Sequence, residues 1–101
     1  MALLIARRTI GRVAVVEDDP ASRESYGYVL EDAGVTPLLE DGPFPDIGGL
    51  IEHLLAKADA ALCDYRLRGS GYATFNGDEL AACLYERRFP AMLCTRFMDS
   101  D

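Results

Sequence analysis

The chain has 101 residues, a length that accommodates one small domain. Half of its residues are hydrophobic and 27% are charged, a composition typical of a globular fold and not of disorder. Its 17 acidic and 10 basic residues give a formal net charge of −7, which disfavours direct binding to nucleic acid because the phosphate backbone is also negative.

The apolar runs are all too short to span a membrane, and residues 1–10 (MALLIARRTI) do not have the pattern of a secretory signal peptide. The cysteines Cys63, Cys83 and Cys94 lie in apolar segments without metal-ligand spacing, and His53 is the single histidine. An odd number of such cysteines indicates reduced thiols, so we expect a cytoplasmic protein. The same inventory excludes a zinc site and a Ser-His-Asp catalytic triad.

The first predicted strand is the short β-branched run 12–16 (RVAVV), a pattern typical of a buried strand. Asp19 as N-cap and Pro20 as first helical residue predict a helix immediately afterwards, and Gly34 is expected to end it. The apolar side of this helix is predicted to be a stripe with helical spacing, formed by Tyr26, Val29, Leu30 and Ala33.

A second strand is predicted over 35–39 (VTPLL), where Pro37 indicates the edge of a sheet. After a turn, a second amphipathic helix begins at Asp46, with apolar positions at Ile47, Leu50, Ile51, Leu54 and Leu55. The apolar run 60–63 (AALC) predicts a third strand that leads directly into Asp64.

A polar loop over 66–76 precedes a third helix, predicted for 78–88, and the run 91–95 (AMLCT) predicts a fourth strand. The order β-α-β-α-β-α-β is typical of an α/β fold with a parallel sheet, right-handed crossovers and helices on both faces. In such doubly wound sheets, functional residues gather at the carboxyl ends of the strands, near the point where the strand order reverses.

Polar residues stand at three of these predicted ends, namely Glu17 and Asp18 after the first strand, Asp64 after the third and Thr95 at the end of the fourth. Close carboxylates repel one another unless a cation lies among them, and oxygen donors without His or Cys suit Mg²⁺. An aspartate at such a metal can attack phosphorus and form an acyl phosphate. A threonine hydroxyl can donate a hydrogen bond to a phosphoryl oxygen.

The chain resembles the receiver domain of two-component response regulators in four segments that occur in the family's order: 13–20 (VAVVEDDP), 61–67 (ALCDYRL), 77–80 (GDEL) and 90–95 (PAMLCT). The resemblance implies a flavodoxin-like, receiver-type doubly wound parallel sheet. In this interpretation 1–11 are an N-terminal extension and 12–101 form the domain. The family's last helix, strand and helix have no counterpart, which makes the fold incomplete, with about four strands and three helices.

The resemblance implies that Asp64 accepts a phosphoryl group from a sensor histidine kinase or phosphotransfer protein. Asp18, and Glu17 through water, would hold Mg²⁺ together with Asp64 and the backbone carbonyl of Arg66. Thr95 would be the switch hydroxyl. Because phosphorylation is self-catalysed from a donor, we do not expect an enzyme, and the signal would pass to a downstream protein partner by contact.

The sequence departs from the family at three points. The family's lysine at the end of the fifth strand has no counterpart, and Lys57 is the only lysine of the chain, so the candidate replacements are Arg66, Arg68 and Arg96. Arg96 also occupies a position where the family usually has a small residue. The loop after Asp64 is longer than usual, and its extra residues 69–75 (GSGYATF) are a lid, a partner contact or a tolerated insertion.

Without a fifth strand, the fourth would present an unpaired apolar edge, which favours a homo-oligomer through that edge. Residues 3–10 either cover this edge or form a tail. The main alternative function is a degenerate receiver that acts as a phosphorylation-independent interaction or dimerisation module. A small Mg²⁺-dependent phosphohydrolase shares the carboxylate chemistry, but the sequence supplies no second general acid for it.

Overall fold

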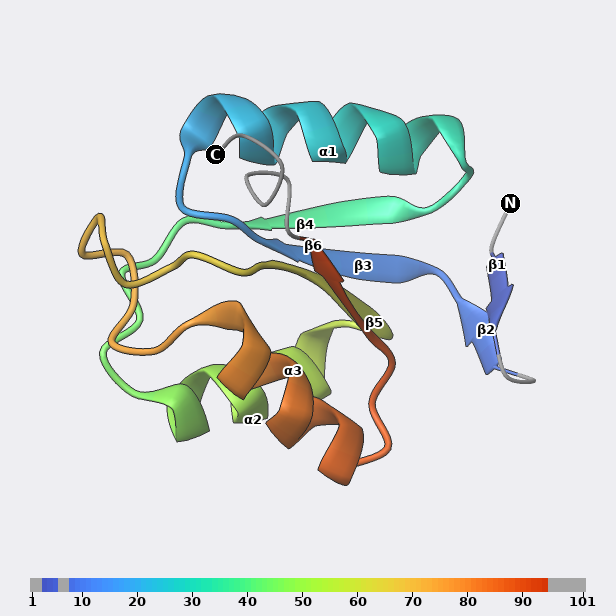
Figure 1. Ribbon diagram of the computed structural model, residues 1–101. Helices are drawn as coiled ribbons and strands as arrows, with labels where there is room; N and C mark the ends of the chain where they lie inside the picture. The colour runs from blue at the N-terminus through green and yellow to red at the C-terminus, as the bar shows by residue number, and fades with distance from the viewer. Residues whose placement is uncertain (1–2, 6–7, 95–101) are drawn as a thin grey trace.

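The computed structural model describes residues 3–5 and 8–94. In chain order, these residues form the strands and helices β1 (Leu3–Ile5), β2 (Arg8–Ile10), β3 (Arg12–Val16), α1 (Pro20–Asp32), β4 (Thr36–Glu40), α2 (Ile47–Lys57), β5 (Ala60–Asp64), α3 (Gly77–Glu86) and β6 (Ala91–Cys94). Four parallel strands form one sheet in the order β4-β3-β5-β6, with α1 on one face and α2 and α3 on the other (Figure 1). The predicted flavodoxin-like α/β fold is therefore confirmed.

Strand β3 lies inside the sheet, paired with β4 and β5. Its residues 13–16 are all buried, because helices cover both faces of a parallel sheet. Strand β4 is an edge strand, as Pro37 indicates. It begins at Thr36, one residue later than predicted, because the Val35 N–H donates to the Leu30 carbonyl at the end of α1.

The predicted helix starts agree with the capping contacts. The Asp19 side chain accepts a hydrogen bond from the Ser22 N–H at 3.0 Å, and Asp46 accepts one from the Gly49 N–H at 2.9 Å. Gly34 follows α1 with φ of 86°, the left-handed conformation that a glycine adopts without strain at this position. Each helix thus begins or ends where the sequence carries the appropriate residue.

The apolar stripe predicted for α1 is wrong in part. Val29 is 64% exposed and Ala33 is exposed, whereas the buried residues of the helix are Arg23 and Gly27. The line of contact with the sheet runs through Gly27, where an added Cβ would lie 3.2 Å from Leu39 Cδ2. The absence of a side chain at this position allows α1 to approach β4 closely and turns Val29 toward solvent.

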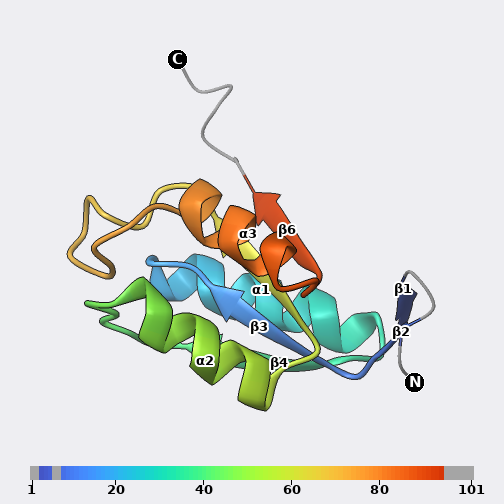
Figure 2. The same cartoon turned by 90° about the horizontal axis from the view of Figure 1, so that it is seen from below.

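The main hydrophobic core lies between the sheet and the pair α2 and α3, which Figure 2 shows side by side over this face. The predicted apolar positions of α2 contribute to it, with Leu50, Ile51 and Leu54 buried. A smaller cluster lies at the amino end of the sheet on the α1 side, and consists of Ile10, Val13, Val35 and Ala60 with Leu30 and Leu62 packed against it.

The loop between β5 and α3 is part of the core and not a tolerated surface insertion. Its residues Leu67, Tyr72 and Phe75 are buried. The Phe44 N–H donates to the Tyr72 carbonyl at 2.7 Å and the Thr74 N–H donates to the Phe44 carbonyl at 3.3 Å. Backbone hydrogen bonds therefore hold this loop against the connection between β4 and α2.

The N-terminal extension pairs with itself. Strands β1 and β2 form an antiparallel two-stranded sheet at the amino end of the main sheet (Figure 1). Ile10, in β2, is 1% exposed and packs in the smaller cluster. The strands of this segment do not pair with β6, so the expectation that residues 3–10 cover that edge is wrong for the described residues.

Helix α3 ends at Glu86, two residues earlier than predicted, because Arg88 adopts φ of 59°. The Phe89 N–H then donates to the Leu84 carbonyl at 2.9 Å, the hydrogen bond of a left-handed helix terminus. A non-glycine residue in this conformation is strained by contact between its Cβ and the following carbonyl.

We therefore expect Arg88→Gly to stabilise the fold by about 1 kcal/mol, because glycine has no Cβ to clash in the left-handed conformation. The measurement is the free energy of unfolding in urea. Arg87→Gly is the control, since Arg87 has φ of −91°. It is expected to destabilise the fold, because glycine gains freedom in the unfolded chain and the exposed ion pair with Glu52 is lost. Equal destabilisation by both changes would contradict the strain at Arg88.

Candidate functional site

Three carboxylates meet at the carboxyl end of the sheet. Strands β3 and β5 are adjacent, with Val16 opposite Cys63, so the residues that follow leave both strands at the same edge. Glu17, Asp18 and Asp64 each place one carboxylate oxygen within 4.8 Å of the others. Glu17 is 0% exposed, Asp64 is 1% exposed and Asp18 is half-buried. We call these three residues the acidic site.

Mutual repulsion makes the acidic site a candidate for a cation. Two carboxylates about 4.8 Å apart repel each other by about 3 kcal/mol at an effective dielectric constant of about 20. Two of the three are buried, so water screens this repulsion only weakly. The donor set consists of carboxylate oxygens, and Asp18 keeps the site open to solvent, which fits a divalent cation such as Mg²⁺.

Backbone N–H groups orient two of the carboxylates. The Asp19 N–H donates to Glu17 Oε2 at 3.1 Å, and the Arg66 N–H donates to Asp64 Oδ2 at 3.2 Å. The second contact turns the chain back around Asp64 directly after β5. The Arg66 carbonyl follows Asp64 by two residues in the sequence, and its role as a metal ligand remains a prediction.

Gly77 is required where α3 passes the acidic site. Its N–H donates to the Tyr65 carbonyl at 2.8 Å, and a Cβ at this position would overlap the backbone carbonyl of Asp64. The first residue of α3 thus lies against the backbone of the predicted phosphoacceptor. Only a residue without a side chain permits this approach.

We expect Gly77→Ala to destabilise the protein by about 2 kcal/mol, because the overlap forces the Asp64 backbone to move. Helix propensity alone predicts the opposite sign, a gain of about 1 kcal/mol for alanine. Chemical denaturation measures the difference. Gly69→Ala is the control, since a Cβ at Gly69 would meet nothing within 4 Å, and a similar loss for both variants would refute the close approach.

The structure gives a separate outcome for each of the remaining candidate residues. Thr95 and Arg96 fall outside the described residues. The side chains of Arg66 and Arg68 are exposed. Lys57 is the last residue of α2, which precedes β5, and therefore lies toward the amino end of the sheet and away from the acidic site.

The sequence analysis missed Arg23, which is 8% exposed. Its Nη1 donates to the Glu17 carbonyl at 2.7 Å, and its Nη2 lies 3.6 Å from Asp41 Oδ1. The signal that points to it is the spacing of Arg23 and Gly27, which are four residues apart on one side of α1. A glycine within a helix often marks the side that packs closely against a neighbouring element. Because Arg23 shares this side of α1 with Gly27, the spacing indicates that Arg23 is buried.

The thiols near the site are held in the protonated form. Burial, with a smaller contribution from the neighbouring Cys94, raises the pKa of Cys63 to about 12. Burial also raises the pKa of Cys94, a hydrogen bond with Tyr26 lowers it, and the negative charges of Asp64 and Glu17 raise it. The thiolate, which is the nucleophilic form, is therefore scarce at neutral pH at both positions.

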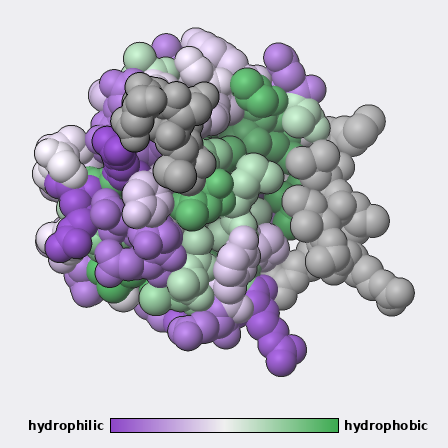
Figure 3. Space-filling model, viewed as in Figure 1, coloured by the Kyte–Doolittle hydropathy of each residue, from purple (hydrophilic) through white to green (hydrophobic). Residues whose placement is uncertain are grey.

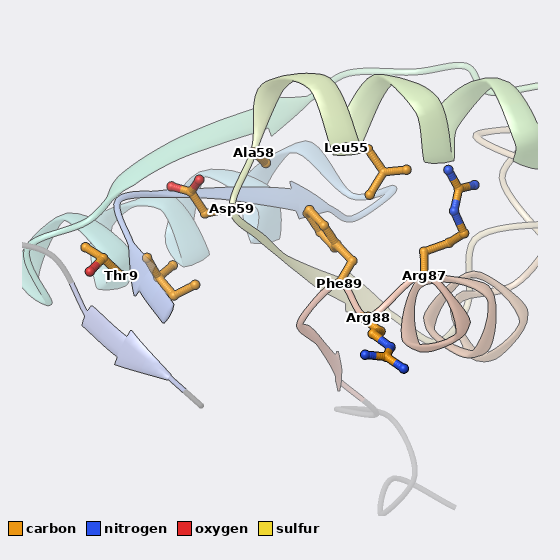
Figure 4. A pocket seen from close by; sticks show the side chains of 8 residues that line it. Thr9, Leu55, Ala58, Asp59, Arg87, Arg88 and Phe89 are labelled. Atoms are coloured by element: carbon orange, nitrogen blue, oxygen red, sulfur yellow. The ribbon is translucent and has the colours of Figure 1, made fainter. Parts of the chain in front are cut away.

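A pocket of about 450 Å³ lies at the opposite end of the sheet (Figure 4), lined by Thr9, Ile10, Leu55, Ala58, Asp59, Arg87, Arg88 and Phe89. Several of its charged groups already have partners in the chain. Asp59 Oδ2 accepts hydrogen bonds from the Gly11 and Arg12 N–H groups at 2.9 Å, and these bonds lower the pKa of Asp59. Arg87 Nη1 lies 3.3 Å from Glu52 Oε2.

Comparison with known proteins leaves the family open: neither the scan of protein-family models nor the search of curated proteins finds a match. Within the described residues, all helices are too short or too polar to cross a membrane.

Proposed function

We propose that the chain is a receiver-like domain of a two-component signalling system, in which Asp64 takes a phosphoryl group with the help of Mg²⁺. The observation that carries the proposal is the meeting of Glu17, Asp18 and Asp64 within 4.8 Å at the carboxyl end of a parallel sheet. The four segments that resemble the receiver family, in the family's order, support it. The reduced-thiol pattern of the cysteines supports a cytoplasmic location.

In the proposed reaction, an Asp64 carboxylate oxygen attacks the phosphorus of a phosphohistidine on the kinase or phosphotransfer protein. The P–O bond forms as the P–N bond breaks, and the imidazole leaves with the bonding electron pair and takes up a proton. The Arg66 N–H on Oδ2 fixes the orientation of the attacking carboxylate. Asp18 and Glu17 would hold Mg²⁺, which when bound offsets the charge of the carboxylates and the phosphoryl oxygens.

A degenerate receiver, acting as a phosphorylation-independent interaction module, is the second candidate. The observation that favours it is the position of the chain's only lysine, Lys57, in α2 and away from the acidic site. The side chains of Arg66 and Arg68 are exposed, and the planar fork of an arginine is not equivalent to the ammonium group of a lysine. In both cases the signal leaves by contact with a downstream protein and involves no enzymatic activity of the domain.

Incubation with a small acyl phosphate and Mg²⁺ is expected to add the mass of one phosphoryl group to the intact protein. The gain is expected to disappear in Asp64→Asn, which lacks the nucleophilic oxygen pair, and when Mg²⁺ is removed with a chelator. Mass spectrometry of the intact chain measures it.

Asp78→Asn serves as the control, because Asp78 is an exposed carboxylate in the first turn of α3, near the site but outside it. It is expected to be labelled like the unmodified protein. Persistent labelling of Asp64→Asn would reject Asp64 as the acceptor. A complete lack of labelling under conditions that label an ordinary receiver would favour the interaction module.

We also propose a homo-oligomer through the edge of β6, which among the described residues pairs only with β5. Met92 is 62% exposed and Leu93 is 36% exposed, and Figure 3 shows apolar residues gathered on this side of the molecule. The Pro90 and Cys94 carbonyls accept hydrogen bonds from β5 and from Tyr65, so the alternate backbone groups of β6 face outward. One of these, the Ala91 carbonyl, accepts a hydrogen bond from the Tyr85 hydroxyl at 2.7 Å.

Met92→Lys is expected to weaken self-association, because a charge on an exposed edge strand opposes pairing with a second copy. Sedimentation velocity over a range of concentrations measures it. The matched control is Leu39→Lys on β4, the opposite edge, where Leu39 is 43% exposed and Pro37 already blocks strand pairing. A monomer at all concentrations for the unmodified chain would refute this part of the proposal.

A further inference from the structure

We propose that Arg23 and Tyr72, the Arg23–Tyr72 clamp, position the carboxylates of Glu17 and Asp18 for cation binding. Arg23 comes from α1 and Tyr72 from the long loop between β5 and α3. Both are positioning residues, since they act through the backbone of Glu17 and not on the cation. The inference rests on the proposed function, because that function assigns a cation to the acidic site.

Arg23 supports the backbone of the acidic site through a hydrogen bond. Its Nη1 donates a 2.7 Å hydrogen bond to the Glu17 carbonyl, and this carbonyl belongs to the peptide group that joins Glu17 to Asp18. Because this peptide group is planar, holding its carbonyl restrains the backbone from which both side chains leave. The bond is made by a charged donor and is buried, which makes it stronger than an ordinary surface hydrogen bond.

The burial of Arg23 indicates a specific role for its guanidinium. Removing a cation from water costs several kcal/mol unless partners replace the lost hydration. The charged partner that the structure gives it, Asp41, is 3.6 Å away and 86% exposed, so solvent weakens this ion pair. The Glu17 carbonyl and the aromatic ring of Tyr72 also replace part of the hydration that the guanidinium loses on burial.

Tyr72 lies over the guanidinium and is itself held on two sides. The Arg23 Cζ lies 5.7 Å from the centroid of the Tyr72 ring, within the range of a cation–π contact. The Tyr72 hydroxyl donates to the Glu40 carbonyl at 2.6 Å, and the ring packs edge-to-face against Phe44 with centroids 5.3 Å apart. Burial raises the pKa of Tyr72, so the hydroxyl remains a donor.

The same loop has a contact with Asp64 and a contact with the arginine that holds Glu17. It follows Asp64, whose Oδ2 accepts the Arg66 N–H, and eight residues after Asp64 it places Tyr72 on Arg23. The length of this loop therefore has a physical consequence, because it lets one segment link Asp64, at the end of β5, to the arginine that supports Glu17, directly after β3.

The test measures the affinity of the full chain for Mn²⁺. Electron paramagnetic resonance gives the concentration of free Mn²⁺ during the titration. Arg23→Lys keeps the positive charge but loses the planar guanidinium, and Tyr72→Ala removes the aromatic ring. Each change is expected to weaken Mn²⁺ binding by about 10-fold, which is the usual effect of replacing a residue that orients metal ligands. Tyr72→Phe keeps the ring over the guanidinium and is expected to restore most of the affinity. A loss of stability alone would not produce this order among folded variants.

Arg12→Lys is the matched control, because Arg12 is an exposed arginine at the amino end of β3, the opposite end of the sheet from the acidic site, and the Mn²⁺ affinity of this variant is expected to equal that of the unmodified chain. Circular dichroism establishes that each variant is folded. If Arg23→Lys does not fold, the difference in Mn²⁺ affinity between Tyr72→Ala and Tyr72→Phe tests the clamp instead. Unchanged binding in Arg23→Lys and Tyr72→Ala would overturn the clamp alone, whereas no Mn²⁺ binding by the unmodified chain would overturn the proposed cation site and the clamp together.

Discussion

The parallel pairing of β3 with β5 is the constraint on which the rest of the structure depends. It places the carboxyl ends of two buried strands side by side, and the residues at those ends are Glu17, Asp18 and Asp64. Burial of like charges at such short range is unfavourable, so the surrounding elements must compensate for it. The backbone N–H donors of Asp19 and Arg66 are part of this compensation.

The need to compensate for buried charge also explains why other elements pack closely against the acidic site on two sides. On one side, Gly77 allows the start of α3 to lie against the carbonyl of Asp64. On the other, the buried guanidinium of Arg23 supports the carbonyl of Glu17 and is covered by Tyr72. The elements around the acidic site therefore hold the two strand ends in a fixed relation, which is a condition for binding a cation with defined geometry.

The two ends and the two edges of the sheet differ in character. Buried carboxylates gather at the carboxyl end, whereas the amino end carries the β1–β2 pair and an aspartate, Asp59, that accepts backbone hydrogen bonds. Strand β4 carries Pro37, which discourages further pairing, while β6 presents exposed Met92 and Leu93. The proposed self-association at the β6 edge and the proposed phosphoryl chemistry at the acidic site therefore use different parts of the domain.

The sequence by itself determined the type and order of the main strands and helices, because caps and apolar runs act within a few residues. It also placed the three carboxylates together, since parallel strands end at one edge. The tertiary structure alone decided which side of α1 faces the sheet, that Arg23 is buried, and that the long loop belongs to the core. The physical reason is that burial of a charged or loop residue depends on partners far away in the chain, such as Tyr72 for Arg23, which local periodicity does not record.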